Sequence, residues 1–175
     1  TMNTSLPPLD GVVVADFSRV LAGPLATMTL ADLGAEVIKV ERPETGDDTR
    51  AWGPPWTPQS GGTSASYFEC VNRSKQSVTW DLSDPADLAA ARALIARADV
   101  LVENFKTGAL DRLGLGYDDV AALNPRLIYC SITGFGSGAG ADLPGYDFAV
   151  QAVGGLMSIT GHPDAAGGEP TKVGV

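Results

Sequence analysis

Cysteine, histidine and long apolar runs are scarce or missing in this sequence of 175 residues. Its two cysteines, Cys70 and Cys130, do not have the spacing of metal ligands, so we expect reduced thiols and no metal site. The single histidine, His162, has no serine or cysteine nucleophile beside it, which predicts a surface residue. No apolar run approaches the ~18 residues of a membrane span, and the N-terminus lacks the features of a signal peptide. We therefore expect a cytoplasmic protein without a membrane partner.

Basic residues are also few. Lys and Arg number 12 against 21 Asp and Glu, which gives a net charge of −9 and a pI near 4.4. The overall field repels polyanions, so nucleic acid is not an expected partner. An anionic ligand would have to be met by basic residues gathered locally.

Glycine is missing where a dinucleotide-binding fingerprint would need it. The segment FSRVLAGP, residues 17–24, contains only Gly23, whereas the fingerprint reads G-x-G-x-x-G. Arg19 and the bulky Val20 and Leu21 occupy the segment in which the fingerprint has its glycines, so ordinary NAD binding is disfavoured. Arg42, directly after Glu41, suits a phosphate better than a ribose hydroxyl.

The most informative stretch that is present runs from Leu9 to Pro43. It contains an expected strand at Val12–Asp16, a helix at Pro24–Leu33 that ends at Gly34, and a second strand at Glu36–Val40. Two buried strands joined by a crossover helix in about 30 residues are typical of a parallel βαβ unit. The strand ends and the helix N-terminus of such a unit make a site for phosphorylated ligands.

Further strands and helices follow this unit. We expect strands at Ser77–Leu82, Asp99–Glu103 and Leu127–Thr133, and helices at Ala86–Arg97, Gly108–Leu113, Asp118–Leu123 and Tyr146–Leu156. Between Arg42 and Ser66 the composition predicts an excursion over the surface rather than a packed element. We expect a flexible segment at residues 1–8 and an α/β domain at 9–175, with a Rossmann-like open parallel sheet and helices on both faces.

Several basic residues lie near the ends of predicted strands. Arg42 and Lys106 follow strands, Arg112 comes one turn later, and Lys75 precedes a strand. Because ligands bind at the carboxyl ends of parallel strands, these four side chains are candidates for one phosphate site. The alternative is that these four side chains do not converge and are separate, solvated charges on surface loops. Asp147, after the Pro144-Gly145 turn, is either a reactive carboxylate or a helix cap.

The sequence resembles the N-terminal part of the family III CoA-transferases, which include formyl-CoA transferase, carnitine CoA-transferase and α-methylacyl-CoA racemase. The resemblance rests on six blocks in order: LDGVVVADFSRVLAGP, GAEVIKVERPETGDDTR, YFECVNRSKQSVTWDL, ADVLVENFKTGALDRLGL, NPRLIYCSITGFG and PGYDFAVQAVGGLMSITG. Together these blocks cover nearly the whole chain. The resemblance implies that the chain is an incomplete large domain, without the small domain and the C-terminal return of this fold.

The resemblance also implies a set of CoA contacts, with CoA as a substrate and no tightly bound cofactor. They fall on Val20, Leu21, Ala22, Arg42, Asn72, Arg73, Ser74, Lys75, Asn104, Phe105, Lys106, Arg112, Thr133, Gly134, Phe135 and Gly136. Basic side chains would meet the phosphates, and apolar side chains would line the adenine and pantetheine path.

For the reaction, the resemblance implies transfer of CoA between an acyl-CoA and a free carboxylic acid. The nucleophile of such transferases is an aspartate that forms an acyl anhydride, and we expect it a few residues beyond Val175. The chain alone is therefore expected to be inactive. Racemase members carry histidine at the position of Tyr146, and tyrosine, with a pKa near 10, does not replace that base at neutral pH. Transferase is thus favoured over epimerase.

Two alternatives stay open from the sequence: an α-methylacyl-CoA epimerase and a non-catalytic nucleotide-binding module. The family resemblance implies acyl-CoA and carboxylic acids as partners, and an interlocked homodimer for the whole protein.

Overall fold

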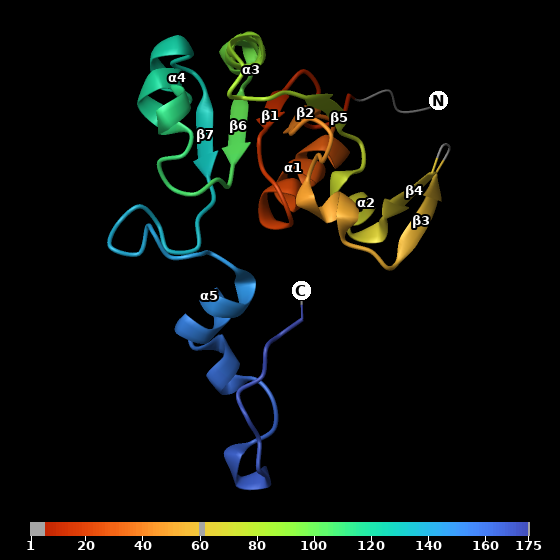
Figure 1. Cartoon of the computed structure of the whole chain (residues 1–175), viewed down its shortest axis with the longest axis vertical. Coiled ribbons are helices and arrows are strands. Elements are labelled where there is room, and N and C mark those ends of the chain that lie inside the picture. The colour runs from red at the N-terminus through yellow and green to blue at the C-terminus, as the bar shows by residue number, and fades with distance from the viewer. Residues whose placement is uncertain (1–5, 60–61, 175) are drawn as a thin grey trace. The chain divides into compact units, whose positions relative to one another are not determined.

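The computed structural model describes residues 6–59 and 62–174 (Figure 1). The chain forms two compact units, one that ends at Ile132 and one that begins at Thr133. Most of the segment 1–8 that we expect to be flexible lies outside the described residues.

The first unit is built on a parallel sheet of five strands in the order β5-β2-β1-β6-β7. The strands are β1 (Val13–Asp16), β2 (Glu36–Glu41), β5 (Gln76–Thr79), β6 (Val100–Glu103) and β7 (Ile128–Ser131). The chain adds β2 and β5 on one side of β1 and then returns to add β6 and β7 on its other side. The strand order therefore reverses between β1 and β6. Open parallel sheets bind ligands at such a switch point, beside the carboxyl ends of the strands. The predicted Rossmann-like sheet is confirmed.

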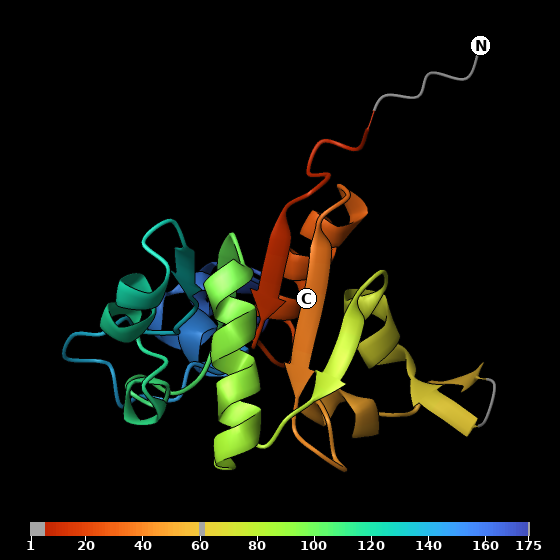
Figure 2. The same ribbon diagram turned by 90° about the horizontal axis from the view of Figure 1, so that it is seen from above.

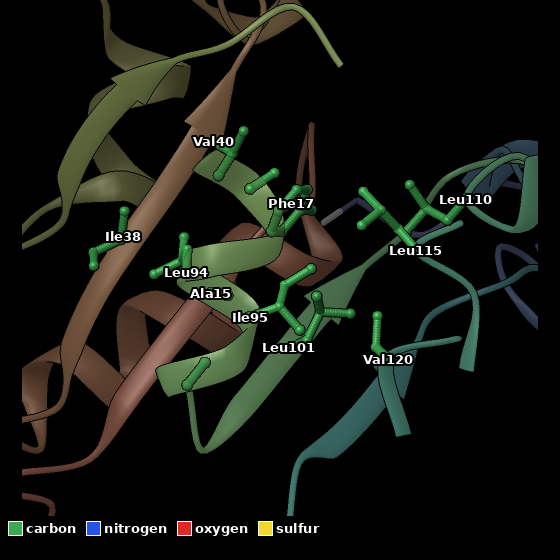
Figure 3. Packing of buried hydrophobic residues seen from close by; sticks show 12 residues of the cluster. Ala15, Phe17, Ile38, Val40, Leu94, Ile95, Leu101, Leu110, Leu115 and Val120 are labelled. Atoms are coloured by element: carbon green, nitrogen blue, oxygen red, sulfur yellow. The ribbon is translucent and has the colours of Figure 1, made fainter. Parts of the chain in front are cut away.

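Helices cover both faces of this sheet. Alternate strand residues point to opposite faces, so Val14 and Val37 pack with α1 (Ala22–Asp32). Their neighbours Ala15 and Ile38 belong to the other core, which contains residues of α3 (Pro85–Arg97) and α4 (Tyr117–Leu123). Figure 2 shows α3, in green, in front of the sheet and α1, in orange-red, behind it. In Figure 3, Leu94 and Ile95 of α3 point toward Ala15 and Leu101.

Local sequence signals explain where α3 begins. Asp84 is its N-cap, and the carboxylate accepts hydrogen bonds from the backbone N–H groups of Ala86 and Asp87 at 2.8 and 3.2 Å. Pro85 occupies the first turn, where its missing N–H costs nothing. The helix predicted at Ala86–Arg97 is confirmed, with its first residue one position earlier.

The segment 42–66 is exposed over much of its described length, as its composition predicts, but it also contains packed elements, which was not predicted. It contains a 3-10 helix η1 (Asp48–Ala51) and a hairpin of β3 (Trp56–Gln59) and β4 (Gly62–Ala65), followed by α2 (Ser66–Asn72). Asp47 and Thr49 are fully buried against β2. The prediction was wrong for these buried residues because β2 carries buried charges, Lys39 and Glu41, whose polar partners this segment supplies.

Two other predicted elements are shorter in the structure. The expected helix at 108–113 is a 3-10 helix η2 over Asp111–Leu113. The expected strand at 77–82 ends with β5 at Thr79, because Asp81 and Ser83 form a side-chain-stabilised turn. This early end leaves Trp80, Asp81 and Leu82 in a loop after the strand.

The second unit contains α5 (Asp147–Val153), η3 (Leu156–Ile159) and η4 (Asp164–Ala166). Buried Gln151 bonds both backbone groups of Val173, its amide oxygen accepting at 2.9 Å and its amide nitrogen donating at 3.1 Å. Asp147 is the first residue of α5 rather than its cap, and its carboxylate pairs with Lys172 at 2.7 Å. The polypeptide near Val173 is thus tied to α5 by side chains.

Close packing at the start of α1 allows only glycine at position 23. A Cβ there would lie 2.2 Å from the Cβ of Ser18, which is completely buried. We predict that Gly23→Ala lowers the free energy of unfolding by about 1–3 kcal/mol, because the overpacked contact outweighs alanine's better helix propensity. Urea denaturation measures this loss. Gly138→Ala is the matched control, since a Cβ at Gly138 meets nothing within 4 Å; equal stability losses would contradict the packing argument.

Candidate functional site

A cleft of about 560 Å³ opens at the carboxyl ends of β1, β2, β5 and β6. Its walls come from the loops that follow these strands. The lining residues are Phe17, Arg19, Val40, Glu41, Arg42, Pro43, Glu44, Thr45, Trp80, Asp81, Leu82, Ser83, Phe105 and Leu113. The position agrees with the switch-point rule for open parallel sheets. The cleft is therefore the candidate ligand site of the first unit.

Two arginines supply positive charge to this cleft. Arg42 follows β2, and its half-exposed guanidinium is paired with Asp48. Arg19 follows β1, and its guanidinium lies 4.7 Å from the ring centre of Phe105. Arg42 and Phe105 were candidates from the sequence. Arg19 was not, because the sequence showed it only as an obstacle to a dinucleotide fingerprint.

The apolar part of the cleft includes Trp80 and Leu82, which the sequence reasoning also missed. Both were expected inside a strand, where their side chains would pack on one face of the sheet rather than line a cleft beyond the strand end. The Asp81 carboxylate accepts from the N–H and hydroxyl of Ser83 at 2.9 and 2.6 Å. An Asp-x-Ser sequence at the end of an apolar run was the signal available for this turn.

Other predicted contacts lie around the loop between β1 and α1. Val20 has a left-handed backbone with φ of 70°, Leu21 is the N-cap position of α1, and Ala22 is its first residue. Asn104 faces this loop, since its side chain bonds both backbone groups of Arg19 at 2.8 and 2.7 Å. Contact of these residues with CoA stays a prediction.

The predicted contacts at 72–75 lie at the end of α2 and before β5. Of the described residues that line the cleft, none comes from this segment. The Lys75 ammonium is 2% exposed and donates to Asp16 at 3.0 Å, to the carbonyl of Pro24 at 2.8 Å and to Asn72 at 2.9 Å. Burial lowers the pKa of Lys75, against the opposing effect of Asp16. Arg73 pairs with Asp32 of α1, and Ser74 has a φ of 64°. Their contact with CoA also stays a prediction.

The remaining candidates are distributed over both units. Lys106 is exposed and directly follows Phe105, and Arg112 precedes Leu113 of the cleft wall. Thr133, Gly134, Phe135 and Gly136 open the second unit, where the Thr133 hydroxyl accepts from the N–H of Gly136 at 2.8 Å. These six residues also stay predictions as CoA contacts.

A network of buried charges stands behind the cleft, on the sheet face that α1 covers. Lys39 and Asp47 form an ion pair at 2.9 Å, with side chains 1% and 0% exposed. Burial alone would raise the pKa of Asp47, but the Lys39 ammonium and hydrogen bonds from Thr49 hold it below its ordinary value. Glu41 of β2 binds Arg50 through both carboxylate oxygens at 2.7 Å. This network fixes the strand ends from which the cleft loops emerge.

Within residues 6–59 and 62–174, no cluster of three or more His, Cys, Asp or Glu side chains is arranged to hold a metal ion. None of the helices there is long and apolar enough to cross a membrane. Cys70 and Cys130 are both free and exposed, as the expectation of reduced thiols requires.

The sheet order and the cleft define an α/β protein of the Rossmann-like class, with a candidate ligand site at the switch point. The profile of CoA-transferase family III matches residues 9–175, and the chain belongs to this family. The resemblance seen in the sequence is thereby confirmed.

Individual relatives agree with this assignment. The chain is 54% identical to a succinate–glutarate CoA-transferase of Agrobacterium fabrum, over 97% of the chain and 42% of that relative. It is 49% identical to a human succinyl-CoA:glutarate CoA-transferase, over 98% of the chain and 38% of that protein. The crystal structure of a CAIB/BAIF family protein from Brucella suis superposes with a TM-score of 0.92 at 53% identity, over 98% of the chain and 44% of that structure. The chain thus spans about two fifths of the length of these relatives.

Proposed function

We propose that this chain is the CoA-binding part of a CoA-transferase, and that the cleft receives the phosphorylated nucleotide end of CoA. The observation that carries the proposal is the joint presence of Arg19 and Arg42 with apolar walls at the switch point. Guanidinium groups form strong charge-assisted hydrogen bonds to phosphate. Phe105 and Trp80 offer aromatic surface to an adenine ring. A volume of about 560 Å³ is within the range of small-molecule sites.

The reaction proposed for a polypeptide of the relatives' length exchanges CoA between two carboxylates. An aspartate beyond Val175 attacks the acyl-CoA carbonyl, the CoA thiolate leaves, and an acyl-aspartyl anhydride forms. The thiolate then attacks the aspartyl carbonyl, which releases the donor acid and leaves CoA on the enzyme as a thioester. The acceptor carboxylate then attacks the aspartyl thioester and expels the thiolate, which gives a second anhydride. The thiolate attacks the acceptor's carbonyl in this anhydride, so that the new acyl-CoA forms and the aspartate is released. The proposal includes a homodimer and a cytoplasmic location.

Calorimetric titration of the chain with CoA, ADP and NAD tests the binding proposal. We expect CoA to bind more tightly than ADP, because it presents more phosphate and pantetheine surface, and NAD to bind weakest. Tight binding of NAD without binding of CoA would overturn the proposal in favour of a nucleotide-binding module of another kind.

Turnover is tested with succinyl-CoA and glutarate, the pair that the relatives' names suggest. We expect exchange by the longer polypeptide that continues this chain and none by the 175 residues alone. Exchange by the 175 residues alone would show that the nucleophile lies within them, contrary to the proposal.

Arg42→Ala is predicted to weaken CoA binding about 10- to 100-fold, since a charge-assisted hydrogen bond to phosphate contributes about 1.5–3 kcal/mol. Calorimetry of CoA and of 3′-dephospho-CoA measures the loss and shows which phosphate is involved. Arg126→Ala serves as the matched control, because Arg126 is exposed and precedes β7, away from the strand ends that form the cleft. Unchanged CoA affinity in the Arg42 variant would remove this residue from the site.

A further inference from the structure

The loop between β1 and α1 is held through its backbone by side chains from elsewhere in the first unit. Five consecutive backbone groups are bonded in this way: Ser18 N–H to Asp16 at 3.0 Å, Ser18 C=O to Lys39 at 2.8 Å, Arg19 N–H and C=O to Asn104 at 2.8 and 2.7 Å, and Val20 N–H to Asp47 at 3.3 Å. A loop bonded so completely has one defined conformation.

The peptide unit between Arg19 and Val20 is held at both ends. Its C=O accepts from the Asn104 amide, and its N–H donates to the Asp47 carboxylate. The orientation of this peptide plane sets the φ of Val20, which is 70°. A β-branched residue rarely adopts this left-handed conformation without such support.

Asp47 is itself fixed on the side away from the loop. Its carboxylate pairs with Lys39 at 2.9 Å and accepts from the N–H and hydroxyl of Thr49 at 3.0 and 2.8 Å. Asp47 is fully buried and is not among the described residues that line the cleft. One direct connection from Asp47 to the cleft is its bond with the N–H of Val20 in this loop.

Arg19 is the cleft residue that this loop presents. Its backbone is bonded on both sides by Asn104, and its guanidinium lies over Phe105. Asn104 thus holds the backbone of Arg19 and also the carbonyl of the peptide that precedes Val20, whose φ is 70°. The left-handed Val20 and the position of Arg19 are thus parts of one arrangement.

We propose that Asp47 and Asn104 are positioning residues that hold the Arg19–Val20 peptide, and thereby keep Arg19 at the cleft for a phosphate of CoA. The inference rests on the proposed function for the identity of the ligand. It assigns a role to Asp47, a buried residue that does not line the cleft. It also assigns Asn104 an indirect role, in which Asn104 affects the ligand by holding the loop that carries Arg19.

Asp47→Asn is the first test, with CoA as the probe in calorimetry. The variant keeps an oxygen that can accept but loses the ion pair with Lys39, and we expect CoA to bind about tenfold more weakly. Circular dichroism establishes that the variant protein is folded. If Asp47 had a purely structural role, the folded variant would bind CoA with unchanged affinity. Asp10→Asn, an exposed change of the same charge, is the matched control and should bind CoA like the unaltered chain.

Rescue by glycine separates positioning from contact. Glycine adopts a positive φ without steric cost, so Val20→Gly added to Asp47→Asn should restore most of the lost affinity. The same rescue is expected for Asn104→Ala, which leaves no unpaired buried charge and therefore folds even if the Asp47 variant does not. If Asn104 contacted CoA directly, glycine at position 20 would restore nothing.

The outcomes distinguish the inference from the proposed function. Binding of CoA by the unaltered chain together with unchanged affinity in both variants, or a loss that glycine does not recover, would overturn the positioning role alone. Absence of CoA binding by the unaltered chain would overturn the proposed function and this inference with it.

Discussion

Replacement of Lys39 by methionine is expected to lower the free energy of unfolding by about 3–5 kcal/mol, the range found when one partner of a buried ion pair is removed. The Lys39 ammonium and the Asp47 carboxylate lie 2.9 Å apart and are both almost completely buried. Methionine fills a similar volume but leaves Asp47 with an uncompensated charge. It also removes the donor that bonds the carbonyl of Ser18 at 2.8 Å.

Urea denaturation of the Lys39→Met variant measures this loss, and Arg73→Met is its matched control. The Arg73 pair with Asp32 joins two helices at the surface, where its side chain is 57% exposed. Exposed pairs contribute about 0–1 kcal/mol because water screens them. A loss of similar size in both variants would show that the buried pair is no more important than the exposed one.

The sequence predicted the architecture of the first unit because that architecture follows from local signals. Val12–Asp16 and Glu36–Val40 have the apolar character of strands buried on both faces, and the helix between them ends at a glycine. The structure has β1, α1 and β2 at these places, with differences of one or two residues at their ends. Parallel pairing follows from the crossover, so it needed no further information.

The segment 42–66 could not be predicted in the same way, because its structure depends on partners distant in the sequence. Glycine, proline and polar residues are typical of exposed loops. Here Asp47 is buried because Lys39 is its ion-pair partner, and Arg50 is held because Glu41 accepts hydrogen bonds from its Nε and Nη2. A lysine in an apolar strand was the available sign that a carboxylate had to be buried nearby.

The candidate site, too, could be predicted only in part. Arg42 was predicted because it follows a strand, and the carboxyl ends of parallel strands share one edge of the sheet, whereas Phe105 was predicted only from the family resemblance; both line the cleft. Sequence position does not give the direction of a long side chain. Lys75 was therefore a phosphate candidate by its place, whereas the structure shows its three donors directed to Asp16, Asn72 and a backbone carbonyl.

Acid is expected to remove about 3 kcal/mol of stability through Glu41. Burial tends to raise the pKa of this carboxyl, but hydrogen bonds from Arg50, Ser77 and the N–H of Asp47 lower it from an ordinary 4.5 to about 2. A tenfold change in proton affinity corresponds to about 1.4 kcal/mol, which gives about 3 kcal/mol in total. Because the pKa is lower in the folded state, this stability is fully present above pH 4.5 and is lost as the pH falls toward 2.

Urea denaturation at pH 7 and pH 3 tests this linkage by comparing the chain with Glu41→Gln. The neutral amide cannot respond to protons, so the variant should be less stable at pH 7 and lose less than the unaltered chain on acidification. Between pH 7 and pH 3, the difference in free energy of unfolding between the unaltered chain and the variant should shrink by about 2 kcal/mol. Glu36→Gln, an exposed change on the same strand β2, controls for the loss of a negative charge. A difference between Glu41→Gln and the unaltered chain that does not change with pH would mean that Glu41 stabilises β2 through packing and neutral hydrogen bonds rather than through its charge.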